Sequence, residues 1–383
     1  MNFSKLAAYL DRFYAEKNIP GVGFAMYDKH RPVFEHYAGF SDVENGIKFG
    51  PDTIFRLYSA TKVITCTALL QLYEAGLFKL GDPLYAYMPE FRSMTVRHIQ
   101  NDGTVELRPA QTPITIEHLM SMTAGLGALI TDGTMKAIEA SGGEGRTVDV
   151  IRALAKEPLI FEPGTHFKYG CCHDVLGALI EVLSGKTLGA YCKENIFGRI
   201  GMRDTSFELT DEKRFAKLYN RFNGETHTAE SIGESINLKP GRAFESGGGG
   251  LYSTVPDYIL FAEALCNYGL APNGERILQK ETVNELRTNR LCPKAQQDFA
   301  RFGGASKSGY SYGLGVRTLI DREDNNALSH NGEFGWDGAR GCYVVIDPDA
   351  EIALFYAQQE GGSPWYRWHG TVRNYAYASV WED

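Results

Sequence analysis

The sequence predicts an α+β fold in which one antiparallel sheet is built from both ends of the chain and helices fill the middle. The first observation is an N-terminal hairpin, because residues 21–27 and 32–39 are strand-like runs separated by a polar turn. The second is a group of strand-like runs near the other end, at residues 314–320, 342–346 and 352–357. The two groups are expected to pair in a single sheet.

Helical patterns occupy the segment between these strands, which is the third observation. They lie at residues 115–122, 147–156, 175–184 and 256–268, with an amphipathic helix at residues 1–12 and a closing helix within residues 365–381. We expect one unit spanning residues 1–383. Its sheet part would come from residues 1–60 and 300–383, and its mostly helical part from residues 61–299. A cleft is expected where the two parts meet.

The composition excludes several classes of protein. With 383 residues, 43% hydrophobic and 22% charged, the chain can bury a large core. Its net charge of −8 and its lack of a basic run argue against a nucleic-acid or membrane partner. It shows no membrane-length apolar run and no signal peptide. Seven scattered cysteines fit reduced thiols, so we expect a cytoplasmic protein.

Ser59 and Lys62 form the only S-x-x-K in the chain, at the start of its most apolar helical stretch. Residues three apart share one helix face, so the lysine can lie beside the hydroxyl. A lysine kept uncharged by burial and by the positive helix end could take the hydroxyl proton and activate the serine. An isolated match is more often an N-cap serine with a surface lysine. Residues 63–73 carry no charge, however, which predicts a buried helix where the lysine needs a partner or a function.

Five motifs resemble, in the same order, those of serine hydrolases that share a fold with class C β-lactamases and D-Ala-D-Ala peptidases. They are S-A-T-K at 59–62, L-M-S-M-T-A-G-L at 119–126, E-P-G-T-H-F-K-Y at 162–169, G-G-G-L-Y-S-T at 248–254 and G-W-D-G-A-R-G at 335–341. The nearest likeness is to the family VIII carboxylesterases and related acyltransferases. The resemblance covers nearly the whole chain and implies a β-lactamase/transpeptidase-like fold without a cofactor.

Tyr169 occupies the position of the tyrosine in the family's Y-x-N motif, although Cys171 stands where asparagine is usual. The resemblance implies that this tyrosine is a general base or proton relay beside the lysine. A phenol is a poor base near neutral pH unless a positive charge lies close, and Lys62 could supply that charge. Two such groups titrate as a coupled pair, so the sequence leaves open which of them is the general base.

Two segments compete for the family's third motif, which is K-T-G in lactamases and peptidases. His330 begins an H-x-G sequence, and Trp336 begins a W-x-G sequence of the esterase type that ends at Gly338. We favour Trp336, because residues 335–341 and the following Asp-Pro match the esterase pattern. His330 is then a hydrogen-bonded residue at a strand end.

The resemblance further implies an oxyanion hole made by the backbone N–H groups of Ser59 and Ala339. An indole in place of the motif's lysine removes an anchor for a carboxylate and adds a flat apolar wall. We therefore expect a small uncharged or apolar ester that acylates Ser59, with transfer of the acyl group to water or to an alcohol. A β-lactamase or D-Ala-D-Ala peptidase-like amidase on the same residues is the alternative.

Ser311 provides a competing nucleophile, because residues 309–313 fit the G-x-S-x-G elbow of α/β-hydrolases. Asp337 or Asp347 followed by His369 would complete the order of that triad. The elbow needs a strand before the serine and a helix after it. Here a loop is expected before Ser311 and a strand after it, so this alternative is disfavoured.

The remaining chemistries find less support in the sequence. No H-E-x-x-H or C-x-x-C motif occurs, and the run Cys171 to Asp174 is too compact for a tetrahedral metal site, so no metal is expected. A thiol nucleophile at Cys171 or Cys172 has no supporting motif. A penicillin-sensing protein without turnover is a further alternative. Residues 207–245 are expected to form a lid-like loop, and the oligomeric state is left open.

Overall fold

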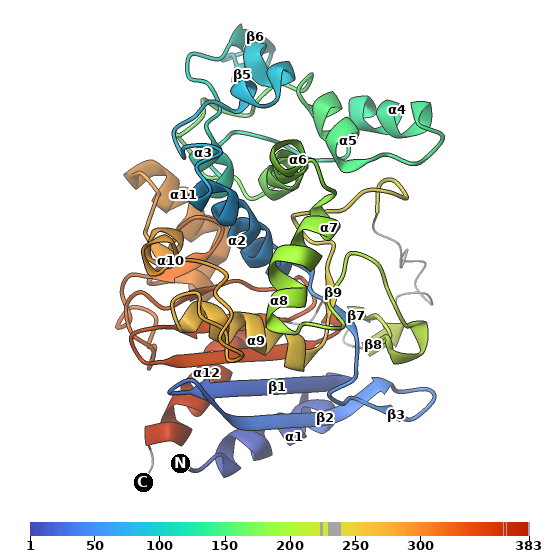
Figure 1. The fold of residues 1–383 in the computed structure, drawn as a ribbon, viewed down its shortest axis with the longest axis vertical. Helices are drawn as coiled ribbons and strands as arrows, with labels where there is room; N and C mark the ends of the chain where they lie inside the picture. The colour runs from blue at the N-terminus through green and yellow to red at the C-terminus, as the bar shows by residue number, and fades with distance from the viewer. Residues whose placement is uncertain (223–224, 229–238, 363, 365, 382–383) are drawn as a thin grey trace.

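The computed structural model of the protein describes residues 1–222, 225–228, 239–362, 364 and 366–381. A sheet with helices on both faces carries a second, mostly helical part (Figure 1). The helices discussed below are α1 (Ser4–Lys17), η1 (Tyr58–Ala60), α2 (Thr61–Glu74), α3 (Ile116–Met120), α4 (Asp132–Ala140), α5 (Thr147–Leu154), α6 (Cys172–Ser184), α7 (Leu188–Cys192), α8 (Gly198–Ile200), α9 (Val255–Cys266), α10 (Lys280–Arg287), α11 (Pro293–Gly303), η7 (Gly304–Lys307) and α12 (Tyr366–Trp381).

Within the described residues, eight strands form one antiparallel sheet in the order β10-β11-β12-β13-β14-β1-β2-β3. Their bounds are β1 Gly21–Asp28, β2 Arg31–Asp42, β3 Ile47–Lys48, β10 Tyr310–Tyr312, β11 Arg317–Leu319, β12 Phe334–Gly335, β13 Tyr343–Asp347 and β14 Ile352–Gln358. β1 pairs with β14 from Val22 opposite Gln358 to Asp28 opposite Ile352. This pairing joins the N-terminal hairpin to the C-terminal strands and confirms the predicted sheet.

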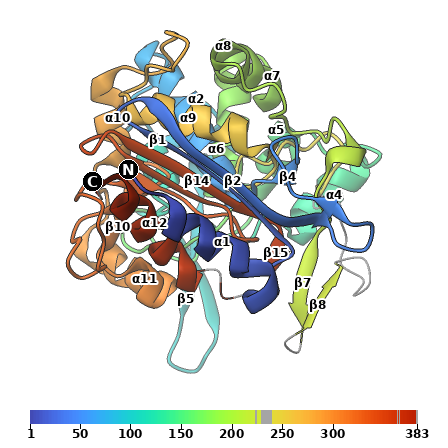
Figure 2. The same ribbon diagram turned by 90° about the horizontal axis from the view of Figure 1, so that it is seen from below.

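Helices cover both faces of this sheet. Helices α1 and α12 lie side by side on one face, as Figure 2 shows, and α9 packs on the other face against β1, β13 and β14. Side chains alternate accordingly: Phe24 and Met26 pack towards α1 and α12, whereas Ala25 packs towards α9. Because both faces are covered, every residue of β13 and β14 is buried.

Helix α2 is the centre of the helical part. It contacts α6, α7 and α10, and most of its side chains are buried, as its uncharged sequence predicts. Helices α3 and α5 pack on α6 from the outside. The predicted helices at residues 115–122, 147–156 and 175–184 are confirmed as α3, α5 and α6.

Three smaller sheets occur among the described residues. They pair β4 (Phe55–Arg56) with β9 (Tyr252–Ser253), β5 (Thr95–Ile99) with β6 (Val105–Pro109), and β15 (Glu360–Gly361) with β7 (Tyr219–Phe222) and β8 (Glu225–Thr228). The β5–β6 hairpin lies within residues 61–299, where we expected mostly helix. Helix α9 also comes from that range but packs on the sheet. Much of the expected lid, at residues 223–224 and 229–238, lies outside the described residues.

No single helix in the described ranges is long and apolar enough to cross a membrane. The consecutive helices of residues 172–184 and 188–200 pass that test only as a pair, and they are bent by 74° relative to each other.

Candidate active site

Ser59 lies in η1, where the chain passes from the sheet into the central helix α2. Tyr58, directly before it, has a φ of 47°, a left-handed conformation that costs a non-glycine residue about 1–2 kcal/mol. Two contacts hold this turn: Leu57 N–H donates to the Leu251 carbonyl at 2.9 Å, and Arg340 Nε donates to the Tyr58 hydroxyl at 2.9 Å. The strained residue is therefore fixed from both sides, directly before the predicted nucleophile.

Lys62 lies one helical turn after Ser59 and is only 3% exposed. Its Nζ donates to Ser59 Oγ at 3.1 Å and to the carbonyl oxygen of Gly248. Both partners are neutral, and Lys62 has no ion pair with any residue that the structure describes. The same Nζ–Oγ contact would let an uncharged amine take the hydroxyl proton.

Tyr169 approaches Lys62 with the face of its ring, whose centroid lies 4.8 Å from Lys62 Nζ. The Tyr169 hydroxyl accepts a hydrogen bond of 3.0 Å from the indole Nε1 of Trp336. The two rings are also stacked, and Phe302 stacks on Tyr169 with centroids 4.8 Å apart. The structure thus brings Ser59, Lys62, Tyr169 and Trp336 together, although within the described chain no hydrogen bond joins the phenol to Ser59 or Lys62.

Gly338 explains how the segment after β12 reaches the nucleophile. A Cβ at this position would lie 2.5 Å from the Leu57 carbonyl oxygen, so only glycine lets the two backbones approach this closely. Gly338 N–H donates to the Cys342 carbonyl at 2.8 Å, which closes the loop on itself. This approach brings Ala339 and Ser59 to the wall of the same cavity.

The Gly-rich run after Ser246 passes directly behind Lys62. Gly248 N–H donates to a carboxylate oxygen of Asp174 at 3.2 Å, while its carbonyl accepts from Lys62. A Cβ at Gly247 would lie 2.3 Å from the carbonyl oxygen of His173, so this segment tolerates no side chain there. Burial raises the pKa of Asp174, although Ser246 and Lys62 oppose the shift.

A cavity of about 600 Å³ opens beside Ser59. Its wall is mostly apolar and includes Tyr169, Trp336 and Phe302. Cations also reach it: Lys307 Nζ lies 5.2 Å from the centroid of the Trp336 ring, and Arg301 lines the rim. Sequence reasoning found neither Phe302 nor Lys307, because both belong to a segment that was expected to be an unstructured loop.

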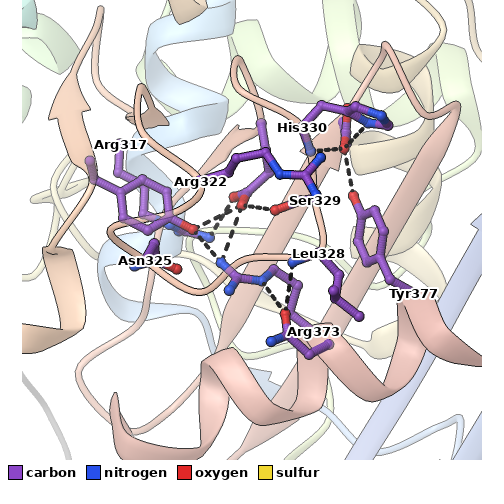
Figure 3. Close-up of polar contacts among 12 residues, drawn as sticks. Arg317, Arg322, Asn325, Leu328, Ser329, His330, Arg373 and Tyr377 are labelled. Atoms are coloured by element: carbon purple, nitrogen blue, oxygen red, sulfur yellow. Dashed lines mark hydrogen bonds and ion pairs between the residues drawn. The ribbon is translucent and has the colours of Figure 1, made fainter.

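His330 is not part of this site. Its backbone N–H donates to Asp347 at 2.9 Å, and its Nδ1 lies 3.2 Å from the same carboxylate oxygen (Figure 3). It precedes β12, whereas Trp336 follows β12, so the two residues lie at opposite ends of that strand. Of the two candidates for the third motif, the structure places Trp336 in the cavity at Ser59 and His330 elsewhere.

Ser311 does not form a nucleophile elbow. It lies within strand β10 and is fully buried, and its hydroxyl donates to Asn289 and Gln296. The next element is strand β11, which pairs with β10 in an antiparallel hairpin, and not the helix that the elbow requires. The α/β-hydrolase alternative is therefore wrong.

Cys171 and Cys172 are unsuited to act as thiolates. Burial raises the pKa of Cys171 well above its ordinary value and that of Cys172 to about 12. Cys171 Sγ instead donates to the Gly127 carbonyl at 3.3 Å. In the described ranges no group of three or more His, Cys, Asp or Glu side chains could hold a metal ion.

The fold and the cavity at Ser59 define a class of proteins, the hydrolases of β-lactamase/transpeptidase-like fold. The sequence matches the Beta-lactamase family over residues 6–372, so the chain belongs to that family. Esterase EstB of Burkholderia gladioli is 30% identical, with 90% of this chain and 87% of that protein covered. Monacolin J acid methylbutanoyltransferase of Aspergillus terreus (strain NIH 2624 / FGSC A1156) is 27% identical, with coverage of 82% and 78%.

Solved structures lead to the same family. The structure of EstCE1, described as a hydrolase with promiscuous acyltransferase activity, superposes with a TM-score of 0.78 at 25% identity. It covers 98% of both chains. The predicted β-lactamase-like fold and the resemblance to esterases and acyltransferases are confirmed.

Proposed function

We propose that this protein hydrolyses carboxylic esters through an acyl-enzyme formed on Ser59. The observation that carries the proposal is the 3.1 Å hydrogen bond between Lys62 Nζ and Ser59 Oγ at the edge of a mostly apolar cavity. The relatives named as an esterase and a hydrolase support the same reaction class.

In the first step, Lys62 takes the hydroxyl proton of Ser59 while Oγ attacks the ester carbonyl carbon. The ammonium that results is stabilised by the Gly248 carbonyl and by the face of the Tyr169 ring. Tyr169 lies beside this amine with the face of its ring and is the proposed second member of the proton-transfer pair. The negative charge on the carbonyl oxygen is held by the N–H groups of Ser59 and Ala339, a contribution of about 3–4 kcal/mol per donor.

The tetrahedral intermediate then collapses, the C–O bond to the alcohol breaks, and the alcohol leaves with the proton. Water repeats the attack on the acyl-enzyme, gives its proton to the Lys62–Tyr169 pair and releases the carboxylic acid. The proton returns to Ser59 Oγ, so the enzyme is regenerated.

The walls next to Ser59 suit an apolar acyl group. Trp336 stands where related lactamases and peptidases carry a lysine, and Phe302 extends the aromatic wall beyond Tyr169. Aromatic faces favour flat or aliphatic groups and provide no charge-assisted anchor. An uncharged ester therefore fits this part of the site better than a β-lactam with its free carboxylate.

The test is turnover of p-nitrophenyl butyrate together with covalent labelling by a fluorophosphonate. We expect Ser59→Ala to lose labelling and to lower kcat/KM by at least about 10⁴-fold. Ser306→Ala is the matched control, because Ser306 lines the same cavity and its hydroxyl donates to the Gly303 carbonyl. Full labelling of Ser59→Ala would overturn the proposal.

The same assays distinguish the neighbouring activities. Faster hydrolysis of nitrocefin than of the ester would favour the β-lactamase alternative on the same residues. Release of nitrophenol that rises with added alcohol, with formation of a new ester, would identify an alcohol as a second acyl acceptor, the reaction named in the Aspergillus relative.

A further inference from the structure

A second cavity, of about 260 Å³, lies beneath the first half of helix α12. It shares Ala305, Ser306, Lys307, Asp337 and Tyr366 with the wall of the cavity at Ser59. The two cavities therefore lie next to each other along the segment η7 and the residue that follows Trp336.

The wall of this second cavity contains buried cations in excess of their carboxylate partners. Lys307, Arg317 and Arg373 are at most 8% exposed. Asp337 pairs with Lys307 and, at 3.1 Å, with Arg317. Glu333 lies 3.3 Å from Arg317 and 3.6 Å from Arg373. Among the described residues this network holds three cations and two anions.

The other polar groups near the network do not remove the excess. Burial lowers the pKa of His369 to about 3 although Asp337 opposes the shift, so this imidazole is neutral. A third buried carboxylate, that of Asp347, belongs to a separate network, where it contacts His330 and Tyr377 (Figure 3). The carboxylate that Arg317 and Arg373 reach in the same figure is that of Glu333, which also accepts a hydrogen bond from Ser329.

The lining of this cavity adds further donors for an anion. Arg367, in the first turn of α12, lines the cavity and is exposed, and the N-terminal end of this 16-residue helix carries partial positive charge. Asn325 and Asn326 line the same cavity and have amide groups that can donate, although Asn325 already donates to the Ser308 carbonyl. Each cation of the network has a carboxylate partner, but the network holds one more cation than anion, so the cavity beside it favours an anion.

We propose that this cavity binds a carboxylate, and that the carboxylate is the far end of an ester whose acyl carbonyl lies at Ser59. The substrate class is then the half-ester of a dicarboxylic acid, with its apolar chain beside Trp336. One excess positive charge matches one carboxylate, and the shared wall at Lys307 places both groups within reach of one molecule. The substrate class rests on the proposed function. The binding of a free carboxylate in this cavity does not depend on that function.

Calorimetric titration of the Ser59→Ala protein with dicarboxylates from glutarate to suberate tests the cavity without turnover. We expect saturable binding of at least one acid in this series and of hexanoate, whose single carboxylate and apolar tail match the two cavities, and weaker binding of sulfate. Equal binding of sulfate and of every dicarboxylate would indicate nonspecific counterion association and would overturn the proposal. So would an absence of binding throughout the series.

Two variants and one control locate the binding. Lys307→Gln and Arg367→Gln should each weaken dicarboxylate binding by about tenfold, because each removes a charge-assisted contact. Arg367 is exposed, so its replacement leaves the fold intact if Lys307→Gln does not fold. Arg301→Gln is the matched control, because Arg301 lines only the cavity at Ser59. An equal loss in the control would overturn the assignment.

A pair of esters links the cavity to the reaction. We compare the mono-p-nitrophenyl ester of adipic acid with p-nitrophenyl hexanoate, which has the same chain length and a neutral end. In the wild-type protein kcat/KM should favour the adipate ester, and Arg367→Gln should lower this preference by about tenfold. If Arg367→Gln stays active and still prefers the adipate ester as strongly as the wild-type protein does, the inferred carboxylate site is overturned and the proposed function is not. Dicarboxylate binding by a protein that hydrolyses neither ester overturns the proposed function alone.

Discussion

Two buried lysines flank the stacked pair of Tyr169 and Trp336, and their surroundings differ. Lys62 lies 4.8 Å from the Tyr169 ring centroid, and among the described residues its hydrogen bonds go only to the neutral oxygens of Ser59 and Gly248. Lys307 lies 5.2 Å from the Trp336 ring centroid and is paired with a carboxylate.

The two environments suit different proposed roles, namely proton transfer for Lys62 and a fixed positive charge for Lys307. Lys62 makes its hydrogen bonds to neutral oxygens, which fits its proposed role of exchanging a proton with Ser59. Burial lowers the pKa of Lys307, but Asp337 opposes that shift and favours the ammonium. Among the described residues, the lysine with a carboxylate partner is thus the one proposed to bind a ligand by its charge, and the lysine without such a partner is the one proposed to transfer a proton.

The largest effect is expected at the lysine with neutral partners. Lys62→Met should lower kcat/KM for p-nitrophenyl butyrate by about 10³–10⁴-fold, because it removes the amine that is hydrogen-bonded to Ser59 Oγ and is proposed to take its proton. The free energy of unfolding should change by about 1 kcal/mol, since no ion pair is broken. Steady-state kinetics and urea unfolding measure the two quantities. Retention of activity within tenfold would contradict the role of Lys62.

Tyr169→Phe should have the next largest effect. The ring and both stacking contacts remain, but the hydroxyl that shares the proton is removed. We expect kcat to fall by about 10²–10³-fold with little change in KM. Tyr14→Phe, in α1 on the far face of the sheet, is the control and should leave kcat unchanged. A rise in KM by a similar factor, with kcat unchanged, would show instead that the phenol acts in substrate binding.

Lys307→Met should act chiefly on stability. It leaves Asp337 buried with Arg317 as its remaining cation, so we expect a loss of about 2–3 kcal/mol in unfolding free energy at neutral pH. Adding Asp337→Asn should recover part of that loss. Lys294→Met is the control, because Lys294 is exposed and lies 3.8 Å from Asp298. A loss below 1 kcal/mol would mean that the pair contributes little.

The smallest effect is the pH dependence of the same ion pair. Burial by itself raises the pKa of Asp337, but Lys307 and Arg317 lower it to about 2. A carboxylate whose pKa is lower in the folded state stabilises the fold above its unfolded pKa and loses this contribution as pH falls towards 2. The contribution is about 2 kcal/mol. The melting temperature, measured from pH 5 to pH 2, should therefore fall less steeply in Asp337→Asn than in the wild-type protein. Parallel plots of melting temperature against pH would contradict the assignment.

The sequence predicts the parts of the site that depend on local spacing. Ser59 and Lys62 meet because three residues make nearly one helical turn, and the uncharged run after them requires a buried helix. Five of the eight described strands of the main sheet follow from short apolar runs bounded by turns, whereas β3, β10 and β12 were not predicted. These features depend on residues close together in the chain, so the sequence alone predicts them.

Contacts between distant segments were not predictable in the same way. His330 precedes β12 and Trp336 follows it. Which end of this strand lies next to α2 depends on how the sheet packs, and the sequence does not show that. The partnership of Lys307 with Asp337 depends on η7, which was expected to be loop. The β5–β6 hairpin was missed because its polar strands pair with each other and bury little apolar surface.

The hydrogen bond from Trp336 to Tyr169 fixes the direction of a hydrogen atom. An indole nitrogen donates and never accepts, so the Tyr169 oxygen receives that bond and must point its own O–H elsewhere. Lys62 Nζ lies over the ring, and no described residue accepts a hydrogen bond from the Tyr169 hydroxyl. Under the mechanism proposed above, this O–H would donate into the cavity towards the oxygen of the departing alcohol, with the tryptophan as a rotational lock on that donor.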